Sequence, residues 1–237
     1  MAGVWLILPT YNEAENIEAV VEAALPRLAA AQPAHTILVV DDNSPDGTGS
    51  IADRLASRIA EVEVLHRPRK EGLGRAYLAG FVRALAGGAE LVVQMDCDFS
   101  HDPADLPRLI AATRDADIVL GSRYVAGGGV SNWALSRRLL SRGGCAYARL
   151  ILGIPVRDLT GGFKCWRRSA LEGLDLEGVD SHGYGFQIEM TYRAVKAGLA
   201  VAEIPIVFRE RSEGKSKMDN WITLEAVWKV PALRLKA

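Results

Sequence analysis

Short apolar runs alternate with longer amphipathic stretches through the first half of the chain. The runs are rich in Val, Ile and Leu and are bounded by turn residues, which predicts buried strands at residues 4–9, 36–40, 62–66, 90–95 and 117–121. Helical spacing between them predicts helices at residues 13–28, 47–59, 72–85 and 103–113. This alternation predicts an α/β fold: a mostly parallel, Rossmann-like sheet with helices on both faces.

Length and composition favour one domain with appendages. With 237 residues, 49% of them hydrophobic, the chain can bury a sizeable core. A net charge of −1 gives no general attraction to nucleic acid, so no nucleic-acid partner is expected. Three scattered cysteines favour a reducing compartment over a disulfide framework or a zinc site. There is no secretory signal, and no apolar run approaches the roughly 20 residues of a spanning helix, so any membrane contact is expected at the surface.

Two carboxylates, Asp96 and Asp98, directly follow the fourth predicted strand. Ligands of open α/β sheets bind outside the carboxyl ends of the strands, and carboxylate oxygens suit a hard divalent cation. The pair therefore predicts a metal-held nucleotide site.

Other strand ends leave alternatives open. The residues PTYNE at 9–13 are typical of helix capping by Thr10 or Asn12 as much as of a binding site. The acidic loop at 41–48 has calcium-like spacing, but a predicted strand precedes it and Pro45 interrupts it, so a calcium loop is disfavoured. His101 is equally compatible with a metal ligand and with a structural role. The absence of a Walker A motif and of G-x-G-x-x-G after the first strand argues against P-loop ATPases and nicotinamide enzymes.

An acid-free tract lies between Asp117 and Asp158. It carries six arginines: Arg123, Arg137, Arg138, Arg142, Arg149 and Arg157. On a helix from residue 132 onward, we expect three of these arginines on one side and four leucines opposite: Arg138, Arg142 and Arg149 against Leu135, Leu139, Leu140 and Leu150. This pattern fits an interfacial helix attracted to anionic headgroups, or else a basic face on a helix packed into the core. The six arginines also suit the binding of an anionic substrate.

Several motifs, taken in order, resemble the polyprenol-phosphate (dolichol-phosphate) mannose synthases, which are family 2 glycosyltransferases with the GT-A fold. They are PTYNE at 9–13, VDDNSPDG at 40–47, MDCD at 95–98, GSRY at 121–124, DLTGGF at 158–163 and GFQIEM at 185–190. The resemblance runs from about residue 6 to residue 217, which implies a catalytic domain over residues 1–217 and a C-terminal amphipathic tail at residues 218–237. The ordered set is far more specific than any single motif.

The resemblance implies inverting transfer of mannose from GDP-mannose to a polyprenol phosphate. Residues expected to hold the guanosine are Pro9, Tyr11, Glu13, Val40 and Asp42. Residues expected along the diphosphate are Asp96, Cys97 (through its backbone) and Asp98, with Asp98 and Asp96 on Mg²⁺ or Mn²⁺. Residues expected at the phosphates are Arg123, Arg211 and Lys217 for donor or acceptor, and Arg137 and Ser141 for the acceptor.

Two positions depart from the family pattern. Cys97 stands where the family usually has Ala, and Ser100 where some members have a Gln metal ligand. The third protein ligand is therefore open between Ser100, His101 and none.

Two rival functions and one question of location follow from the same residues. A polyprenol-phosphate glucosyltransferase using UDP-glucose would need similar metal and phosphate groups, and a non-catalytic subunit could bind the nucleotide sugar or lipid phosphate without turnover. Trp221, Leu224 and Trp228 have helical spacing and either meet a bilayer surface or dock on the core. We expect a cytoplasmic protein that is peripheral at the cytoplasmic membrane face, bound directly or through a membrane-anchored partner.

Overall fold

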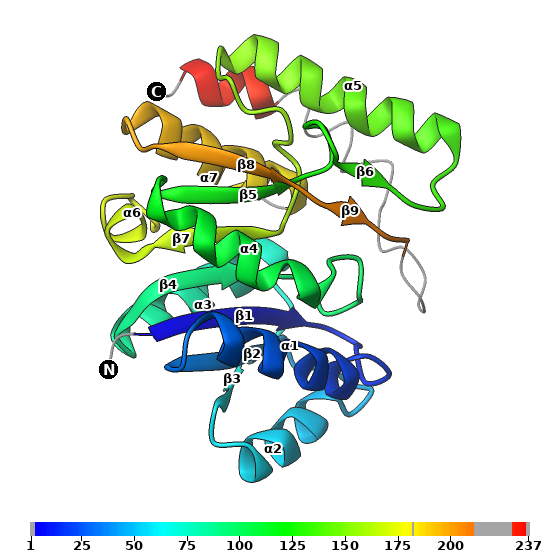
Figure 1. The fold of residues 1–237 in the computed structure, drawn as a ribbon, viewed down its shortest axis with the longest axis vertical. Coiled ribbons are helices and arrows are strands. Elements are labelled where there is room, and N and C mark those ends of the chain that lie inside the picture. The colour runs from blue at the N-terminus through cyan, green and yellow to red at the C-terminus, as the bar shows by residue number, and fades with distance from the viewer. Residues whose placement is uncertain (1–2, 182, 211–228, 236–237) are drawn as a thin grey trace.

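A seven-stranded sheet forms the centre of the molecule (Figure 1). The computed structural model describes residues 3–181, 183–210 and 229–235. The strands of the sheet, in chain order, are β1 (Gly3–Thr10), β2 (His35–Asp41), β3 (Val62–His66), β4 (Ala89–Gln94), β5 (Ile118–Ser122), β7 (Lys164–Arg167) and β8 (Val201–Pro205). Their spatial order is β3-β2-β1-β4-β7-β5-β8, and only β7 runs antiparallel to its neighbours. The predicted mostly parallel sheet is confirmed. A separate pair, β6 (Gly129–Val130) and β9 (Val207–Phe208), lies beside it.

Helices cover both faces of the sheet, as predicted. One face packs against α1 (Ile17–Ala31), α2 (Thr48–Arg58) and α4 (Leu106–Ala111), through an apolar cluster that includes Ile17, Leu55 and Leu109. The other face packs against α3 (Leu73–Ala86), α5 (Leu135–Leu152), α6 (Arg168–Glu172) and α7 (Gly183–Lys196). Short 3₁₀ turns, η1 (Pro103–Asp105) and η2 (Ala112–Arg114), flank α4, so the helix predicted at 103–113 is confirmed only in its central part. The two apolar clusters hold the strand ends at fixed positions.

The first helix begins four residues later than the sequence pattern predicts, at Ile17 instead of residue 13. Asn12 has a left-handed backbone with φ of 57°, which interrupts any helix at that point. Thr10 Oγ1 donates to Asp41 Oδ1 at 3.3 Å, and Asn16 precedes the helix without a side-chain cap. Capping by Thr10 or Asn12 is therefore wrong, and residues 11–16 form a loop at the edge of the sheet.

The acidic loop at 41–48 follows strand β2, as expected, and leads into α2. A helix would have to precede it in a calcium-binding helix–loop–helix unit. Asp46 instead accepts hydrogen bonds from the Thr48 amide and hydroxyl at 3.0 and 2.6 Å. The loop is an ordinary strand-to-helix connection.

Within the described part of the chain, none of the helices is both long enough and apolar enough to span a bilayer. Residues 229–235 are helical and lie beside the carboxyl end of α5, where the Arg234 guanidinium donates to the carbonyl of Ile151 (Figure 1). Trp221, Leu224 and Trp228 lie outside the described residues.

Candidate active site

Three neighbouring parallel strands end at the same edge of the sheet. Pro9 pairs with Val40 across β1 and β2, and Ile7 pairs with Gln94 across β1 and β4. Since β4 ends two residues before Asp96, the two carboxylates lie beside the loops that follow β1 and β2. The structure therefore brings the residues predicted to hold the donor to one edge.

The two carboxylates are held in different ways. Asp98 is 3% exposed, and its Oδ1 accepts a hydrogen bond from the Ser100 amide at 3.0 Å. Asp96 Oδ1 accepts one from the Tyr77 hydroxyl of α3 at 3.2 Å. Burial, and then the negative charge of Asp96, raise the pKa of Tyr77 well above its ordinary value, so the phenol stays a neutral donor. The sequence does not indicate this role for Tyr77, because a buried aromatic residue on a helix has the pattern of a core residue.

These groups fit a divalent cation. Within the described residues, no group of three His, Cys, Asp or Glu side chains could hold a metal ion. Mg²⁺ commonly binds through one or two carboxylates together with substrate phosphates, so Asp96 and Asp98 suffice. Ser100 Oγ adds a buried hydroxyl that has no hydrogen-bond partner among the described residues, which is the kind of atom a ligand would satisfy.

His101 has a structural arrangement instead. Its Nδ1 accepts a hydrogen bond from the Asp96 amide at 3.3 Å, and its ring stacks on Phe163 with centroids 5.1 Å apart. Burial lowers the pKa of His101, so the neutral ring is favoured. These contacts argue against His101 as a third ligand; whether Ser100 or no third protein ligand completes the site stays a prediction.

The sheet edge predicted to hold the guanosine contains a buried ion pair that the sequence analysis did not predict. Arg67 donates to Asp42 Oδ1 at 2.5 Å, and the Glu71 amide approaches the other carboxylate oxygen at 3.4 Å. Burial raises the pKa of Asp42 despite the neighbouring Arg67. Lys70 Nζ lies 4.0 Å from the centroid of the Tyr11 ring. Asp42 is thus fixed before any ligand binds. The sequence places Arg67, Arg69 and Lys70 close together and does not reveal which of them pairs with Asp42.

Arg123, which follows β5 at the same edge, is held more firmly still. Its Nε and Nη2 donate to the two oxygens of Asp158 at 2.7 and 2.6 Å, and Nη2 also donates to Thr160 Oγ1 at 2.8 Å. Burial works against both charges, yet each partner outweighs it, so the pKa of Arg123 is raised and that of Asp158 is lowered. Arg123 is a fixed cation in the wall of the site.

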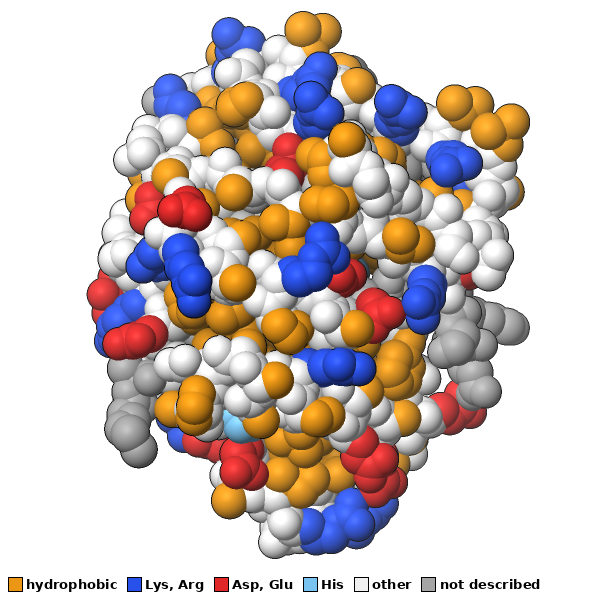
Figure 2. All heavy atoms as spheres, in the orientation of Figure 1, with side chains coloured by type: hydrophobic (Ala, Val, Ile, Leu, Met, Phe, Trp, Pro, Cys, Tyr) orange, Lys and Arg blue, Asp and Glu red, His pale blue; other side chains and the backbone are white. Residues whose placement is uncertain are grey.

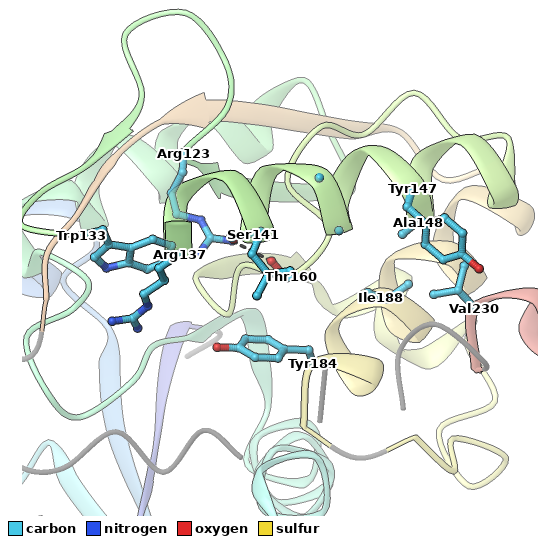
Figure 3. A pocket seen from close by; sticks show the side chains of 13 residues that line it. Arg123, Trp133, Arg137, Ser141, Tyr147, Ala148, Thr160, Tyr184, Ile188 and Val230 are labelled. Atoms are coloured by element: carbon cyan, nitrogen blue, oxygen red, sulfur yellow. Dashed lines mark hydrogen bonds between the residues drawn. The ribbon is translucent and has the colours of Figure 1, made fainter. Parts of the chain in front are cut away.

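A pocket of about 300 Å³ opens next to Arg123, beneath α5 (Figure 3). Arg137 and Ser141, both predicted to contact the acceptor phosphate, line it together with Arg123 and Thr160. Ser141 Oγ accepts from the Tyr124 hydroxyl at 2.7 Å, and the Arg137 guanidinium lies 4.2 Å from the centroid of the Trp133 ring. The three predicted acceptor residues are therefore gathered in one place. Arg211 and Lys217 lie outside the described residues.

Helix α5 differs from the predicted arrangement of its side chains. It packs on the core through the small or aliphatic residues Cys145, Ala148 and Leu152. The leucines do not lie opposite the arginines against the core: Leu135, Leu139, Leu140 and Leu150 are 60–78% exposed. Figure 2 shows orange and blue side chains mixed along the upper rim, where Figure 1 places α5. The exposed leucines contradict a helix that buries its leucines in the core. We call these four leucines with Arg138, Arg142 and Arg149 the outer face of α5.

Two curated relatives match almost the whole chain. An undecaprenyl-phosphate mannosyltransferase of Micrococcus luteus is 47% identical over 234 residues, covering 99% of this chain and 95% of the relative. A polyprenol monophosphomannose synthase of Mycolicibacterium smegmatis is 48% identical over 227 residues, covering 95% and 84%.

Solved structures show the same fold at lower identity. Glucosyl-3-phosphoglycerate synthase of Mycobacterium tuberculosis, in a complex with Mn²⁺, UDP-glucose and phosphoglyceric acid, superposes with a TM-score of 0.74 at 19% identity, covering 98% of this chain and 80% of that one. This likeness concerns the fold alone, and it agrees with the predicted GT-A fold. The model of one family, glycosyl transferase family 2, matches residues 5–175, which include both carboxylates, the acid-free tract and Asp158. This chain belongs to glycosyl transferase family 2.

Proposed function

We propose that the protein transfers mannose from GDP-mannose to a polyprenol phosphate, with inversion at the sugar carbon. The observation that carries the proposal is the 47–48% identity, over nearly the full chain, to two relatives that are both named for mannosyl transfer to such a lipid phosphate. The arrangement of charges supports it. Acidic groups lie where a metal and a diphosphate would bind, and arginines line the adjoining pocket.

Asp96 and Asp98 would hold Mg²⁺ or Mn²⁺, with Ser100 Oγ as a third protein oxygen. When bound, the cation supplies Lewis-acid stabilisation of the negative charge that develops on the leaving diphosphate. Tyr77 orients Asp96 through its hydrogen bond, and the Ser100 amide orients Asp98. The chain's own contribution is to fix these oxygens before the substrate arrives, which lowers the cost of reorganisation.

The acceptor needs little chemical activation. A phosphate monoester is already anionic near neutral pH, so its attack on the sugar requires no strong general base. Among the described residues that line the pocket, none is a carboxylate or a histidine, and the nearby Glu210 accepts from the Arg137 guanidinium at 2.9 Å. Arg137 and Ser141 would position the phosphate, and Arg123, fixed by Asp158, would set the local positive potential. Catalysis is then mainly positioning and electrostatics.

The outer face of α5 supports work at a membrane surface. Its four leucines are exposed, and its three arginines would approach anionic headgroups. We place the protein at the cytoplasmic face of a membrane, bound peripherally through α5. Binding of the purified chain alone to anionic vesicles would support direct attachment. Binding only in the presence of a membrane-anchored subunit would instead indicate attachment through that partner.

A donor panel tests the function. The purified chain is incubated with farnesyl phosphate, Mg²⁺ or Mn²⁺, and either GDP-mannose or UDP-glucose, and the lipid products are identified by mass spectrometry. We expect hexosyl transfer from GDP-mannose that EDTA removes and either cation restores. Preferential transfer from UDP-glucose would assign the chain to the glucosyltransferases, and tight binding of GDP-mannose without turnover would indicate a non-catalytic subunit.

A further inference from the structure

The pocket beneath α5 extends beyond the groups that would meet a phosphate. Its polar end contains Arg123, Arg137, Ser141 and Thr160. Figure 3 shows Tyr147, Ala148 and Val230 at the opposite end, with Ile188 of α7 beside Val230. The far end offers mostly apolar side chains, so the pocket as a whole has the polarity of an amphiphile with one anionic end.

Two adjacent glycines of α5, Gly143 and Gly144, also line this pocket. They lie in the interior of an 18-residue helix, where each costs about 0.5–1 kcal/mol relative to Ala. Neither has a positive φ, and a Cβ added at either one would meet nothing within 4 Å among the described residues. Backbone strain and close packing therefore do not explain them. They leave open space beside the helix.

The side of α5 that borders the pocket begins with Arg137 and continues with small side chains. Arg137, Ser141, Gly144 and Ala148 follow one another at spacings of four, three and four residues, which places them on one side of α5. Tyr147 and Leu140 flank this side. The result is a groove that begins at a guanidinium and continues along exposed helix backbone.

We propose that the apolar part of this pocket, lined by Gly143, Gly144, Tyr147, Ile188 and Val230 and called here the glycine groove, holds the isoprene units next to the acceptor phosphate. The proposal rests on the proposed function for the identity of the acceptor. A volume of about 300 Å³ lies at the lower end of the range for small-ligand pockets, so only the head of a long chain fits. The rest of the lipid leaves past the exposed leucines of α5 toward the bilayer. Gly144 then determines whether a branched isoprenoid can lie against the helix.

The binding test uses thiol protection, which does not depend on catalysis. In Gly144→Cys, the introduced thiol is modified by a maleimide in detergent, with or without farnesyl phosphate. Ala146→Cys is the matched control, because residue 146 is exposed on the same helix and does not line the pocket. The native Cys97, Cys145 and Cys165 are all buried, which keeps background labelling low. We expect farnesyl phosphate to slow modification at position 144 at least about fivefold and to leave position 146 unchanged. Equal protection at both positions, or protection at neither, would contradict the proposal that the glycine groove binds the prenyl chain.

The kinetic test uses Gly144→Leu, with Ala146→Leu as its control. Leucine has a higher helix propensity than glycine, so the melting temperature should be unchanged or raised. We expect the KM for farnesyl phosphate to rise at least about tenfold in Gly144→Leu, while the KM for GDP-mannose stays within about twofold. An unchanged acceptor KM would overturn the inference even if mannose transfer is intact. If the wild-type chain transfers no mannose, the proposed function fails, and thiol protection still decides whether the groove binds a prenyl phosphate.

Discussion

Two regions of this protein organise charge in opposite ways. One is the sheet edge that carries Asp42, Asp96 and Asp98, called here the donor edge, and the other is the side formed by α5. At the donor edge, the polar groups are buried and held by fixed partners, as Asp42 is by Arg67. On the α5 side, arginines and leucines are exposed together on the outer face, and glycines leave the pocket wall open. A soluble nucleotide sugar requires a preorganised set of polar contacts, whereas a lipid acceptor requires an apolar path. Under the proposed function, the nucleotide sugar binds at the donor edge and the lipid acceptor binds beneath α5.

The largest effect is expected from the loss of Asp98, one of the two carboxylates predicted to bind the metal. Asp98→Ala should lower metal-dependent turnover by about a hundredfold to a thousandfold or more, because a ligand to the charge-stabilising cation is lost. Initial rates across a Mg²⁺ and Mn²⁺ titration measure the loss, with circular dichroism as a check of the fold. The exposed Asp115→Ala serves as the control. Normal activity in Asp98→Ala would remove the proposed metal site.

Next in size is the buried ion pair that joins the two regions. Asp158→Asn leaves Arg123 buried without its counter-ion and should destabilise the protein by about 3–5 kcal/mol. Since the pKa of Asp158 is lowered in the folded state, its contribution is present above the unfolded value of 3.8 and is lost as the pH falls through the folded value. The gap between wild type and variant in urea unfolding should therefore be full near pH 7 and should shrink in acid below pH 3.8. The partly exposed pair of Arg108 and Asp105 provides the contrast: Asp105→Asn should cost less than about 1 kcal/mol. Equal costs for the two variants would contradict the assignment of Arg123 as a fixed buried cation.

Arg137→Ala separates the two regions kinetically. It removes the less buried guanidinium of the pocket, so the KM for farnesyl phosphate should rise about tenfold or more while the KM for GDP-mannose changes less than about twofold. Arg27→Ala on α1, exposed and remote from the pocket, is the matched control. Equal increases in both KM values would place Arg137 on the donor instead.

The smallest effect concerns the outer face of α5. Leu139→Gln combined with Leu150→Gln should weaken co-sedimentation with anionic vesicles by about tenfold, because two exposed apolar side chains are lost from the contact. Turnover of farnesyl phosphate in detergent should be retained. Val82→Gln, which removes a similarly exposed apolar residue from α3, should leave vesicle binding unchanged. If the double variant binds vesicles like the wild type, α5 is not the membrane contact.

Features encoded by neighbouring residues were predictable from the sequence. The strand at residues 62–66 was predicted with its observed bounds, and the position of Asp96 and Asp98 at a strand end followed from the apolar run before them. Such features depend on local alternation and on the rule that ligands bind at the carboxyl ends of parallel strands.

Features that depend on distant partners were not predictable. Nothing local indicates that Tyr77 reaches Asp96, that Arg67 folds onto Asp42, or that Asp158 holds Arg123 across 35 positions of sequence. The predicted arrangement of the leucines of α5 was wrong for a related reason. A helical pattern defines an apolar side, but only the packing of neighbouring elements decides whether that side is buried.

The antiparallel strand β7 has a further consequence. Because it runs opposite to β5, the chain leaves the sheet after Ser122 and returns at Lys164 on the same edge, between β5 and β4. Everything in between, including α5, is one closed excursion whose two ends are neighbours. Parts of this excursion are tied to the rest of the molecule, because β6 pairs with β9 and Phe163 stacks on His101. The outer face of α5 is exposed and can change without altering the order of the seven strands. The fold therefore leaves the outer face of α5 free to vary while the sheet and its strand ends stay in place.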